Sequence, residues 1–295
     1  MWEVLDSTKP IKRRGFRGKP GMTNVNRRGE LGSPGIQKKG TIMSQDVKTY
    51  YENYDEGRRL SRDNAHKIEF LTTVHYLNKL LPPGSCILDA CAAEGEYAFY
   101  LAKQGHEVFA CDLVNKHVAA MKANPKADKL AGVEVANVLD LSQFDDERFD
   151  VVLCMGALYH LFEPAEREKC IEECLRVLKY DGIAAFAYIN RHAMYINHIA
   201  MGKSSLEFMN QLRDTGKNLV FYGMDFGEIQ ALAAKFPLTK IADVAIDGLS
   251  YPLAESFNNA TDEEFAAYMD YHLEICEEPS IRGFSMHGLW IGKKE

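Results

Sequence analysis

The sequence predicts an α/β protein whose core is a doubly wound, mostly parallel sheet. Residues 86–112 contain an apolar strand, a loop of small residues, a helix and a second apolar strand, and Asp89 and Asp112 stand at the ends of the two strands. Three further apolar strands follow, with helical stretches between the later ones, at 133–136, from 149 onward and at 183–189. Alternating strands and helices are typical of a parallel sheet. Ligands bind beyond the carboxyl ends of such strands, so both acids are expected to face one crevice.

The loop after the first strand indicates what this crevice binds. It reads Cys91-Ala92-Ala93-Glu94-Gly95, with one glycine and one carboxylate. Dinucleotide-binding loops instead carry Gly-x-Gly-x-x-Gly, which lets a pyrophosphate approach the backbone. A carboxylate in the loop would repel a phosphate, but it would accept a nucleoside that carries a cationic sulfonium.

These residues resemble class I S-adenosylmethionine-dependent methyltransferases, whose loop usually reads Asp-x-Gly-x-Gly-x-Gly. Cys91, Ala93 and Gly95 occupy the three glycine positions, so two of them have become small non-glycine residues. The resemblance implies that Asp89 and the loop backbone face the methionine part of the cofactor and that Asp112 binds the ribose hydroxyls. The residues implied to bind S-adenosylmethionine are Asp89, Cys91, Ala92, Ala93, Gly95, Tyr97, Asp112, Leu113, Asn137, Val138, Met155 and Gly156.

Later segments match the same family in order. Asn137 follows the third strand, where the family binds the adenine amino group, although asparagine there is also a common turn residue. A strand beginning Phe149-Asp150-Val151-Val152 leads into a loop, and Pro164 opens a helix. The resemblance implies a seven-stranded Rossmann-like sheet of order 3-2-1-4-5-7-6 with the last strand antiparallel. Residues 238–246 and 283–292 would supply the last two strands.

Composition is consistent with one such domain. The chain has 295 residues, 46% of them hydrophobic, and no apolar run approaches the ~20 residues that span a bilayer. Most of its seven cysteines lie in expected strands and helices, such as Cys86, Cys154 and Cys170, and none forms a sequence pattern of metal ligands. Buried free cysteines suit a reducing compartment. We therefore expect a cytoplasmic protein with no metal and no membrane partner.

Residues 1–42 differ from the rest. They hold ten Lys and Arg against three acids, a net charge of +7, whereas residues 43–295 hold 25 basic and 39 acidic residues, a net charge of −14. Such a polar, Gly-containing segment is expected to be disordered. Either translation naturally starts at Met43 and residues 1–42 are not native, or they form a basic arm that binds nucleic acid. The methyltransferase domain is expected to span 43–295.

Three segments of this domain are expected to cover the crevice as a helical lid: 45–81, 190–224 and 248–282. The first contains Tyr50-Tyr51 and Arg59-Leu60, which resemble the amino-terminal lid of a bacterial small-molecule methyltransferase subfamily. That subfamily also has a Leu-Tyr-His-Leu loop, here 158–161, and a carboxyl-terminal Gly-x-Ser-x-His, here 283–287. Thr261 to Glu264 form a capping-box pattern that predicts a helix to about Cys276.

Side chains near the transferable methyl group are the candidates for catalysis and acceptor binding. His160 follows the fourth strand and is the first candidate base, because its unperturbed pKa of ~6.5 suits proton transfer. It could equally cap the next helix or pack under the lid. His287 is the second candidate base, and Tyr51 is the third catalytic candidate. The residues expected to bind the acceptor are Tyr50, Tyr54, Arg59, Tyr159, Arg191 and Tyr195.

The favoured function is transfer of a methyl group from S-adenosylmethionine to an oxygen or nitrogen atom of a small molecule, by a monomer or homodimer. The acidic domain makes a nucleic-acid partner unfavourable. A tRNA methyltransferase is the alternative, because Tyr188–Met194 and the carboxyl-terminal Glu278-Pro279 also resemble a tRNA wobble-uridine family. An NAD-dependent oxidoreductase is a weaker alternative that the loop composition opposes, and a non-catalytic cofactor-binding scaffold is a further one.

Overall fold

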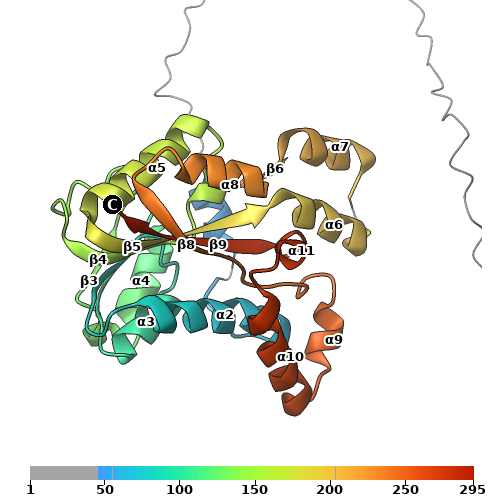
Figure 1. Ribbon diagram of the computed structural model, residues 1–295, viewed down its shortest axis with the longest axis horizontal. Helices are drawn as coiled ribbons and strands as arrows, with labels where there is room; N and C mark the ends of the chain where they lie inside the picture. Colours follow the sequence, from blue (N-terminus) through green and yellow to red (C-terminus); the bar gives the residue numbers. More distant parts are fainter. Residues whose placement is uncertain (1–45, 55, 203) are drawn as a thin grey trace, which may run out of the picture. The chain divides into compact units, whose positions relative to one another are not determined.

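The computed structural model describes residues 46–54, 56–202 and 204–295 of the chain. The expected basic extension, 1–42, lies outside the described residues. Within them, nine strands form one sheet (Figure 1). The strands are β1 Cys86–Asp89, β2 Glu107–Asp112, β3 Gly132–Val135, β4 Phe149–Cys154, β5 Leu178–Asn190, β6 Lys217–Asn218, β7 Phe221–Met224, β8 Leu238–Ala245 and β9 His287–Lys294.

The main order of the sheet is β3-β2-β1-β4-β5-β9-β8. The first five of these strands run parallel to one another, whereas β9 pairs antiparallel with both β5 and β8. Counted along the chain without the two short strands β6 and β7, this is the order 3-2-1-4-5-7-6. The predicted Rossmann-like topology and its antiparallel last strand are confirmed.

Strands β6 and β7 were not predicted. They form a short antiparallel hairpin, and β7 pairs in parallel with the last two residues of β5. Ile189 pairs with His287 of β9 and also with Gly223 of β7, so β7 lies on the other side of β5, beyond the end of β4. The hairpin thus extends the sheet at the edge where the parallel strands end.

Helices cover both faces of the sheet. In Figure 1, α2, α3 and α4 lie on one face, and α5 and α8 lie on the other. The alternating side chains of the central strands supply both cores: Ile87 and Val151 belong to the first, and Leu88 and Val152 to the second. These helices are α2 Asn64–Leu80, α3 Glu96–Lys103, α4 Asn115–Ala123, α5 Pro164–Val177 and α8 Phe226–Ala233.

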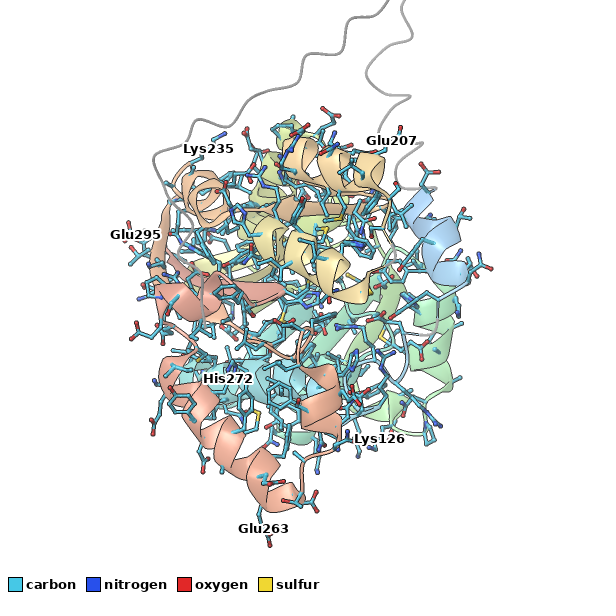
Figure 2. The ribbon with its side chains drawn as sticks, turned by 90° about the vertical axis from the view of Figure 1, so that its right-hand side faces the viewer. Lys126, Glu207, Lys235, Glu263, His272 and Glu295 are labelled. Carbon is cyan, nitrogen blue, oxygen red and sulfur yellow. The ribbon has the colours of Figure 1, made fainter. Side chains whose placement is uncertain are left out.

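The remaining helices belong to the expected lid segments. Seen from the side in Figure 2, α7 with the labelled Glu207 lies at the top, α6 lies below it, and α9 and α10 lie in the lower part, where Glu263 marks the first turn of α10. Residues 46–52 are also helical. The bounds are α6 Arg191–Met201, α7 Leu206–Thr215, α9 Ala254–Asn258, α10 Asp262–Ile275 and α11 Pro279–Arg282. Of the described helices, none is both long and apolar enough to cross a bilayer.

The first expected lid segment divides into two parts with different roles. Helix α2 packs on the sheet through Tyr76 and Leu77 and contacts α9 and α10 on its outer side. Residues 46–54 and 56–62, which precede it, instead reach the crevice, because Lys116 at the start of α4 donates hydrogen bonds to the carbonyl oxygens of Tyr51, Glu52 and Tyr54 at 2.9–3.3 Å. Within the first lid segment, only these residues are placed to cover a ligand.

The capping box predicted at Thr261 is present. The Thr261 hydroxyl accepts the backbone N–H of Glu264 at 3.2 Å, and the Glu264 carboxylate accepts the backbone N–H of Thr261 at 2.9 Å. The helix that it begins, α10, ends at Ile275, one residue before the predicted end.

We expect Thr261→Ala to lower the free energy of unfolding by about 1 kcal/mol, because the first turn of α10 loses its side-chain acceptor. Denaturant unfolding followed by circular dichroism measures this change. Thr261→Ser keeps the hydroxyl and should unfold like the wild type. An alanine variant as stable as the serine variant would contradict the assignment of the cap.

Candidate functional site

Two carboxylates end neighbouring strands at the edge of the sheet. Asp112 ends β2, and its side chain is fixed by hydrogen bonds from the backbone N–H groups of Ala93 at 2.9 Å and Val114 at 2.8 Å. His117 of α4 adds a contact from Nδ1 at 3.1 Å. The acid therefore ties the loop after β1 to the start of α4, and it lies between the two segments that the sequence predicted to bind a ligand.

Asp89, at the end of β1, is only 1% exposed. Its Oδ2 atom is buried and has no hydrogen-bond partner among the described residues. Burial and the neighbouring charge of Asp112 raise the pKa of Asp89 to about 7. A carboxyl group held in this way is stabilised in its ionised form by any cation that enters the crevice.

The loop between these acids keeps a glycine-like backbone although two of its glycines are absent. Ala93 has a φ of 48° and Gly95 a φ of 91°, both in the left-handed region. A β-carbon on Gly95 would lie 2.9 Å from Phe99 and 3.1 Å from Met121, so this position requires glycine. Gly156 likewise leaves room for Cys91, whose β-carbon would lie 2.9 Å from a β-carbon at 156.

Most of the other predicted cofactor residues follow the ends of strands next to this loop, and Tyr97 is the exception. Leu113, Val138 and Met155 follow the ends of β2, β3 and β4. Asn137 follows β3 and is exposed, and its Oδ1 atom accepts the backbone N–H of Leu139 at 3.0 Å. Its side-chain oxygen thus stabilises the turn, while its amide nitrogen has no hydrogen-bond partner among the described residues. Tyr97 instead lies on α3 and stacks on Phe70 of α2.

A second feature is a cavity of about 320 Å³ formed largely by the lid segments. This volume falls at the lower end of the range for small-molecule sites, ~300–1,000 Å³. Its aromatic lining consists of Tyr50, Tyr51, Tyr54, Tyr159, Phe221 and Tyr251. Its charged and imidazole side chains are Glu56, Arg59, His198 and His287. The predicted residues Tyr50, Tyr51, Tyr54, Arg59, Tyr159 and His287 therefore share one cavity.

His287 is fixed in one orientation. Its Nδ1–H donates to Oδ2 of Asp247 at 2.7 Å, and Nε2 has no hydrogen-bond partner among the described residues. The neighbouring charges of Glu69 and Asp247 raise the pKa of the imidazole above its usual 6.5, against the opposite effect of burial. In the neutral ring the free Nε2 is a proton acceptor, and an acid that orients an imidazole in this way is typical of a general base.

The Gly283-x-Ser285-x-His287 motif holds the acid of this pair in place. The Ser285 hydroxyl donates to Oδ1 of Asp247 at 2.5 Å and accepts the backbone N–H of Gly248 at 2.9 Å. Gly248 has a φ of 52°, and a β-carbon there would lie 2.8 Å from His272 of α10. The motif and the lid helix thus fix Asp247 from two sides.

All three nitrogen atoms of the Arg59 guanidinium contact carboxylates. Its Nη1 and Nη2 atoms bind the two oxygens of Glu69 at 2.6 and 2.9 Å, and its Nε binds Oε1 of Glu56 at 2.6 Å. This guanidinium lowers the pKa of the buried Glu69 carboxyl to about 2, together with the charge of His287. Glu69, Asp247 and His287 could together ligate a metal, but the cation that Glu69 already holds is Arg59.

His160 lies beside the cavity with both ring nitrogens engaged. Its Nδ1–H donates to the carbonyl oxygen of Val220 at 2.8 Å, so Nε2 accepts the hydroxyl hydrogen of Tyr51 at 3.0 Å. Burial lowers the pKa of the imidazole to about 4. In this geometry His160 orients Tyr51, whose ring also packs at 5.4 Å from that of His117.

Two residues expected to bind the acceptor are outside the cavity lining. Arg191 pairs with Asp225 at 2.8 Å, and Tyr195 packs against the first core. Conversely, Asp247, Glu69 and Tyr251 were missed. Asp247 was detectable, because it follows the strand 238–246 as Asp89 and Asp112 follow theirs. Nothing in the local sequence distinguishes Glu69 or Tyr251.

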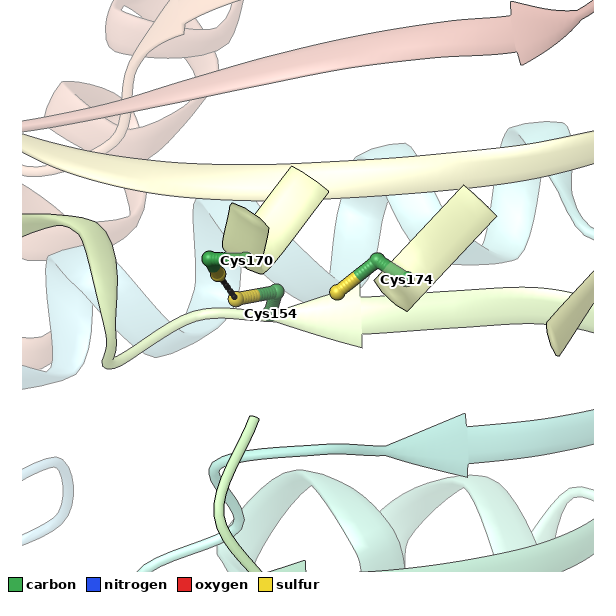
Figure 3. A group of neighbouring side chains, drawn as sticks. All are labelled: Cys154, Cys170 and Cys174. Atoms are coloured by element: carbon green, nitrogen blue, oxygen red, sulfur yellow. Dashed lines mark hydrogen bonds between the residues drawn. The ribbon is translucent and has the colours of Figure 1, made fainter. Parts of the chain in front are cut away.

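Three cysteines come together where the sequence shows no metal-ligand spacing. Figure 3 shows Cys154 at the end of β4 beside Cys170 and Cys174 of α5. Their sulfur atoms lie within 4.8 Å of one another, with 3.6 Å between Cys154 and Cys170. All three are fully buried among the apolar side chains of the second core. Three thiols are one ligand fewer than a tetrahedral zinc site uses, and buried free cysteine packs as a small apolar residue.

Comparison with known proteins identifies the class of domain. Residues 88–186 match the methyltransferase domain family. The glycine/sarcosine N-methyltransferase of Aphanothece halophytica is 31% identical over 99 residues, which are 33% of this chain and 37% of that protein. The tRNA U34 carboxymethyltransferase of Helicobacter hepaticus is 31% identical over 106 residues, which are 31% of this chain and 32% of that protein. The matched regions thus span about a third of these relatives.

A solved structure agrees in fold. The 1,6-didemethyltoxoflavin-N1-methyltransferase of Burkholderia thailandensis, solved with 1,6-didemethyltoxoflavin and S-adenosylhomocysteine, superposes with a TM-score of 0.51. It is 16% identical, and the match covers 91% of this chain and 93% of that one. Residues 88–186 therefore match a methyltransferase domain, the fold agrees with that match, and both are consistent with the predicted cofactor, S-adenosylmethionine.

The crevice suits this cofactor chemically. Asp89 offers a buried carboxylate oxygen with no partner among the described residues, and such an oxygen suits a ligand that carries a sulfonium and an ammonium group. The left-handed backbone at Ala93 and Gly95 forms the close turn that the family builds with glycines. The carboxylates of Asp89 and Asp112 would instead oppose the pyrophosphate of a dinucleotide.

We expect Ala93→Gly to raise the free energy of unfolding by about 0.5–1 kcal/mol, because alanine is strained at a φ of 48° and glycine is not. Thermal unfolding without ligand measures the change. Ala92→Gly is the matched control, since residue 92 has no left-handed φ and should lose stability. Equal effects of the two substitutions would contradict the strain at Ala93.

Cofactor binding should release a proton from Asp89. Its pKa of about 7 in the free protein must fall when a cationic cofactor binds, so affinity should rise as the pH increases toward 8 and proton release should approach one near pH 6. Calorimetry in buffers of different ionisation heat counts the protons. Asp89→Asn should abolish the release, whereas the exposed Asp128→Asn should not. Release that persists in Asp89→Asn would assign the proton to another group.

Proposed function

We propose that this protein transfers a methyl group from S-adenosylmethionine to an oxygen or nitrogen atom of a small molecule that binds in the cavity of the lid segments. The observation that supports this most directly is His287. It is oriented by Asp247 and lines the cavity with a free Nε2. A base in that position suits an acceptor that must lose a proton.

The residues divide into two groups by role. Asp89, Asp112 and the loop 91–95 would hold the cofactor, which supplies an electrophilic methyl group when bound. The cavity residues would hold the acceptor in line, and alignment of this kind lowers the barrier of a displacement reaction. His287 would accept the acceptor's proton at Nε2, with Asp247 stabilising the resulting imidazolium.

Tyr51 would be a binding residue at the boundary between cofactor and acceptor. Its hydroxyl hydrogen is donated to His160, which leaves the oxygen lone pairs available to accept a hydrogen bond. Burial raises the pKa of this hydroxyl well above its usual 10, so it stays protonated. His160 is then a positioning residue, and we assign the base to His287.

Charge favours a small molecule over RNA. Residues 248–282 hold eight acidic side chains and one arginine, and the arginine of the cavity, Arg59, is already paired with two carboxylates. Neither this segment nor Arg59 therefore provides an unpaired cation that could bind a phosphate group. The stretch 188–194, which resembles a tRNA-modifying family, has a structural use: the Tyr188 hydroxyl donates to Asp243 at 2.9 Å, and Asn190 caps α6 and donates to the carbonyl oxygens of Arg282 and Gly283.

The acceptor class can be tested with labelled donor. The full chain is incubated with methyl-labelled S-adenosylmethionine and either bulk tRNA or a deproteinised extract of small metabolites. Label should enter the metabolite fraction. Label in the tRNA that diminishes as salt rises would establish the RNA methyltransferase and refute the small-molecule proposal.

His287→Gln should lower kcat by about 10²–10⁴, because it removes the base, and leave S-adenosylhomocysteine affinity unchanged. Wild-type activity should fall as the pH drops below the raised pKa of this imidazole, where Nε2 is protonated, and the variant should lose that dependence. The matched control is His75→Gln, an exposed histidine of α2. A variant with the wild-type pH profile would exclude His287 as the base.

A further inference from the structure

The cavity has an excess of negative charge. Glu56 and Arg59 line it, and Glu69 and Asp247 stand directly behind Arg59 and His287. Among the described residues this amounts to three carboxylates against one guanidinium and one imidazole. Even with His287 protonated, the acids outnumber the cations. His198 adds no charge, because its ring nitrogens are bonded to Ser204 and Asn218 and burial lowers its pKa.

No cation of the cavity is available for an acidic ligand. Each nitrogen atom of the Arg59 guanidinium contacts a carboxylate at 2.6–2.9 Å, and the salt bridges involve side chains that are 8–17% exposed. A carboxylate ligand would have to displace Glu56 or Glu69 from this arginine. Leaving either acid unpaired in a site with little solvent is unfavourable.

A cation, by contrast, would meet two kinds of favourable group. Oε2 of Glu56 has no bonding partner among the described residues, since only Oε1 contacts Arg59. The rings of Tyr50 and Tyr54 stack with centroids 5.7 Å apart, and Phe221 packs edge-on to Tyr50 at 5.4 Å. The faces of such rings attract ammonium groups, most strongly where water is excluded.

We infer that the cavity selects an acceptor with a protonated amine or another cationic nitrogen, held by Glu56 and the Tyr50, Tyr54 and Phe221 rings, and that it rejects carboxylates. This inference rests on the proposed function, because only a methyltransferase would use the bound ligand as a methyl acceptor. The charge preference itself concerns binding, and it can be measured without turnover.

The test compares two probes of similar shape, 2-phenylethylamine and 3-phenylpropionate, by calorimetry on the full chain saturated with S-adenosylhomocysteine. The amine should bind at least about tenfold more tightly than the carboxylate. Equal or tighter binding of the carboxylate, or no saturable binding of the amine, would overturn the inference.

Substitutions can show which side chains cause the preference for an amine over a carboxylate. Glu56→Gln should reduce the amine-to-carboxylate affinity ratio several-fold, whereas Glu52→Gln, an exposed acid of the same segment, should not change it. Tyr54→Leu should weaken amine binding by roughly two- to fivefold, and Tyr54→Phe, which keeps the ring, should not. A ratio unaltered by Glu56→Gln would refute the assignment, provided that each variant melts and binds S-adenosylhomocysteine like the wild type.

The two proposals fail in different ways. If S-adenosylhomocysteine does not bind, the proposed function is wrong, but the amine preference can still be measured on the free protein. If S-adenosylhomocysteine binds and the carboxylate is preferred, the methyltransferase proposal stands and the cationic acceptor is excluded.

Discussion

The site depends on three carboxylates that follow strands ending at the same edge of the sheet. Asp89 and Asp112 end β1 and β2, and Asp247 follows β8, which runs in the same direction as β5 because both are antiparallel to β9. Each acid has a different environment. Asp112 accepts hydrogen bonds from two backbone N–H groups, Asp89 keeps one oxygen without a partner among the described residues, and Asp247 orients an imidazole.

These environments separate the roles of chemically identical groups. Burial and the neighbouring charge of Asp112 raise the pKa of Asp89, so a cation from outside the protein would stabilise its ionised form. The Asp247 carboxylate finds its partner in His287 and raises the pKa of that ring instead. One edge of the sheet can thus hold a cationic cofactor and a proton-accepting histidine side by side.

The lid segments complete the site through Arg59. This residue joins the stretch before α2 to Glu69 within α2 by a bidentate ion pair, and Glu69 lies 3.5 Å from His287. The network connects the lid, the helix on the sheet and the last strand. The network also pairs this arginine of the cavity with carboxylates. The net charge that a ligand encounters there is therefore negative.

Local sequence patterns predicted the central strands, the acids at their ends and the capping box of α10, because hydrophobic periodicity, strand ends and turn chemistry act over a few residues. The sheet order, the cofactor roles of the acids and the lid residues were implied by the resemblance to a methyltransferase family, and six of the residues predicted to act on the acceptor line the cavity. Tertiary structure favours His287 over His160 as the proposed base, because the state of an imidazole depends on partners 40 to 109 residues away: Asp247 leaves Nε2 of His287 free, whereas Val220 and Tyr51 occupy both nitrogens of His160. It also brought Glu69 and Tyr251 to the site and gathered the three cysteines, since helix packing, and not local pattern, sets those distances.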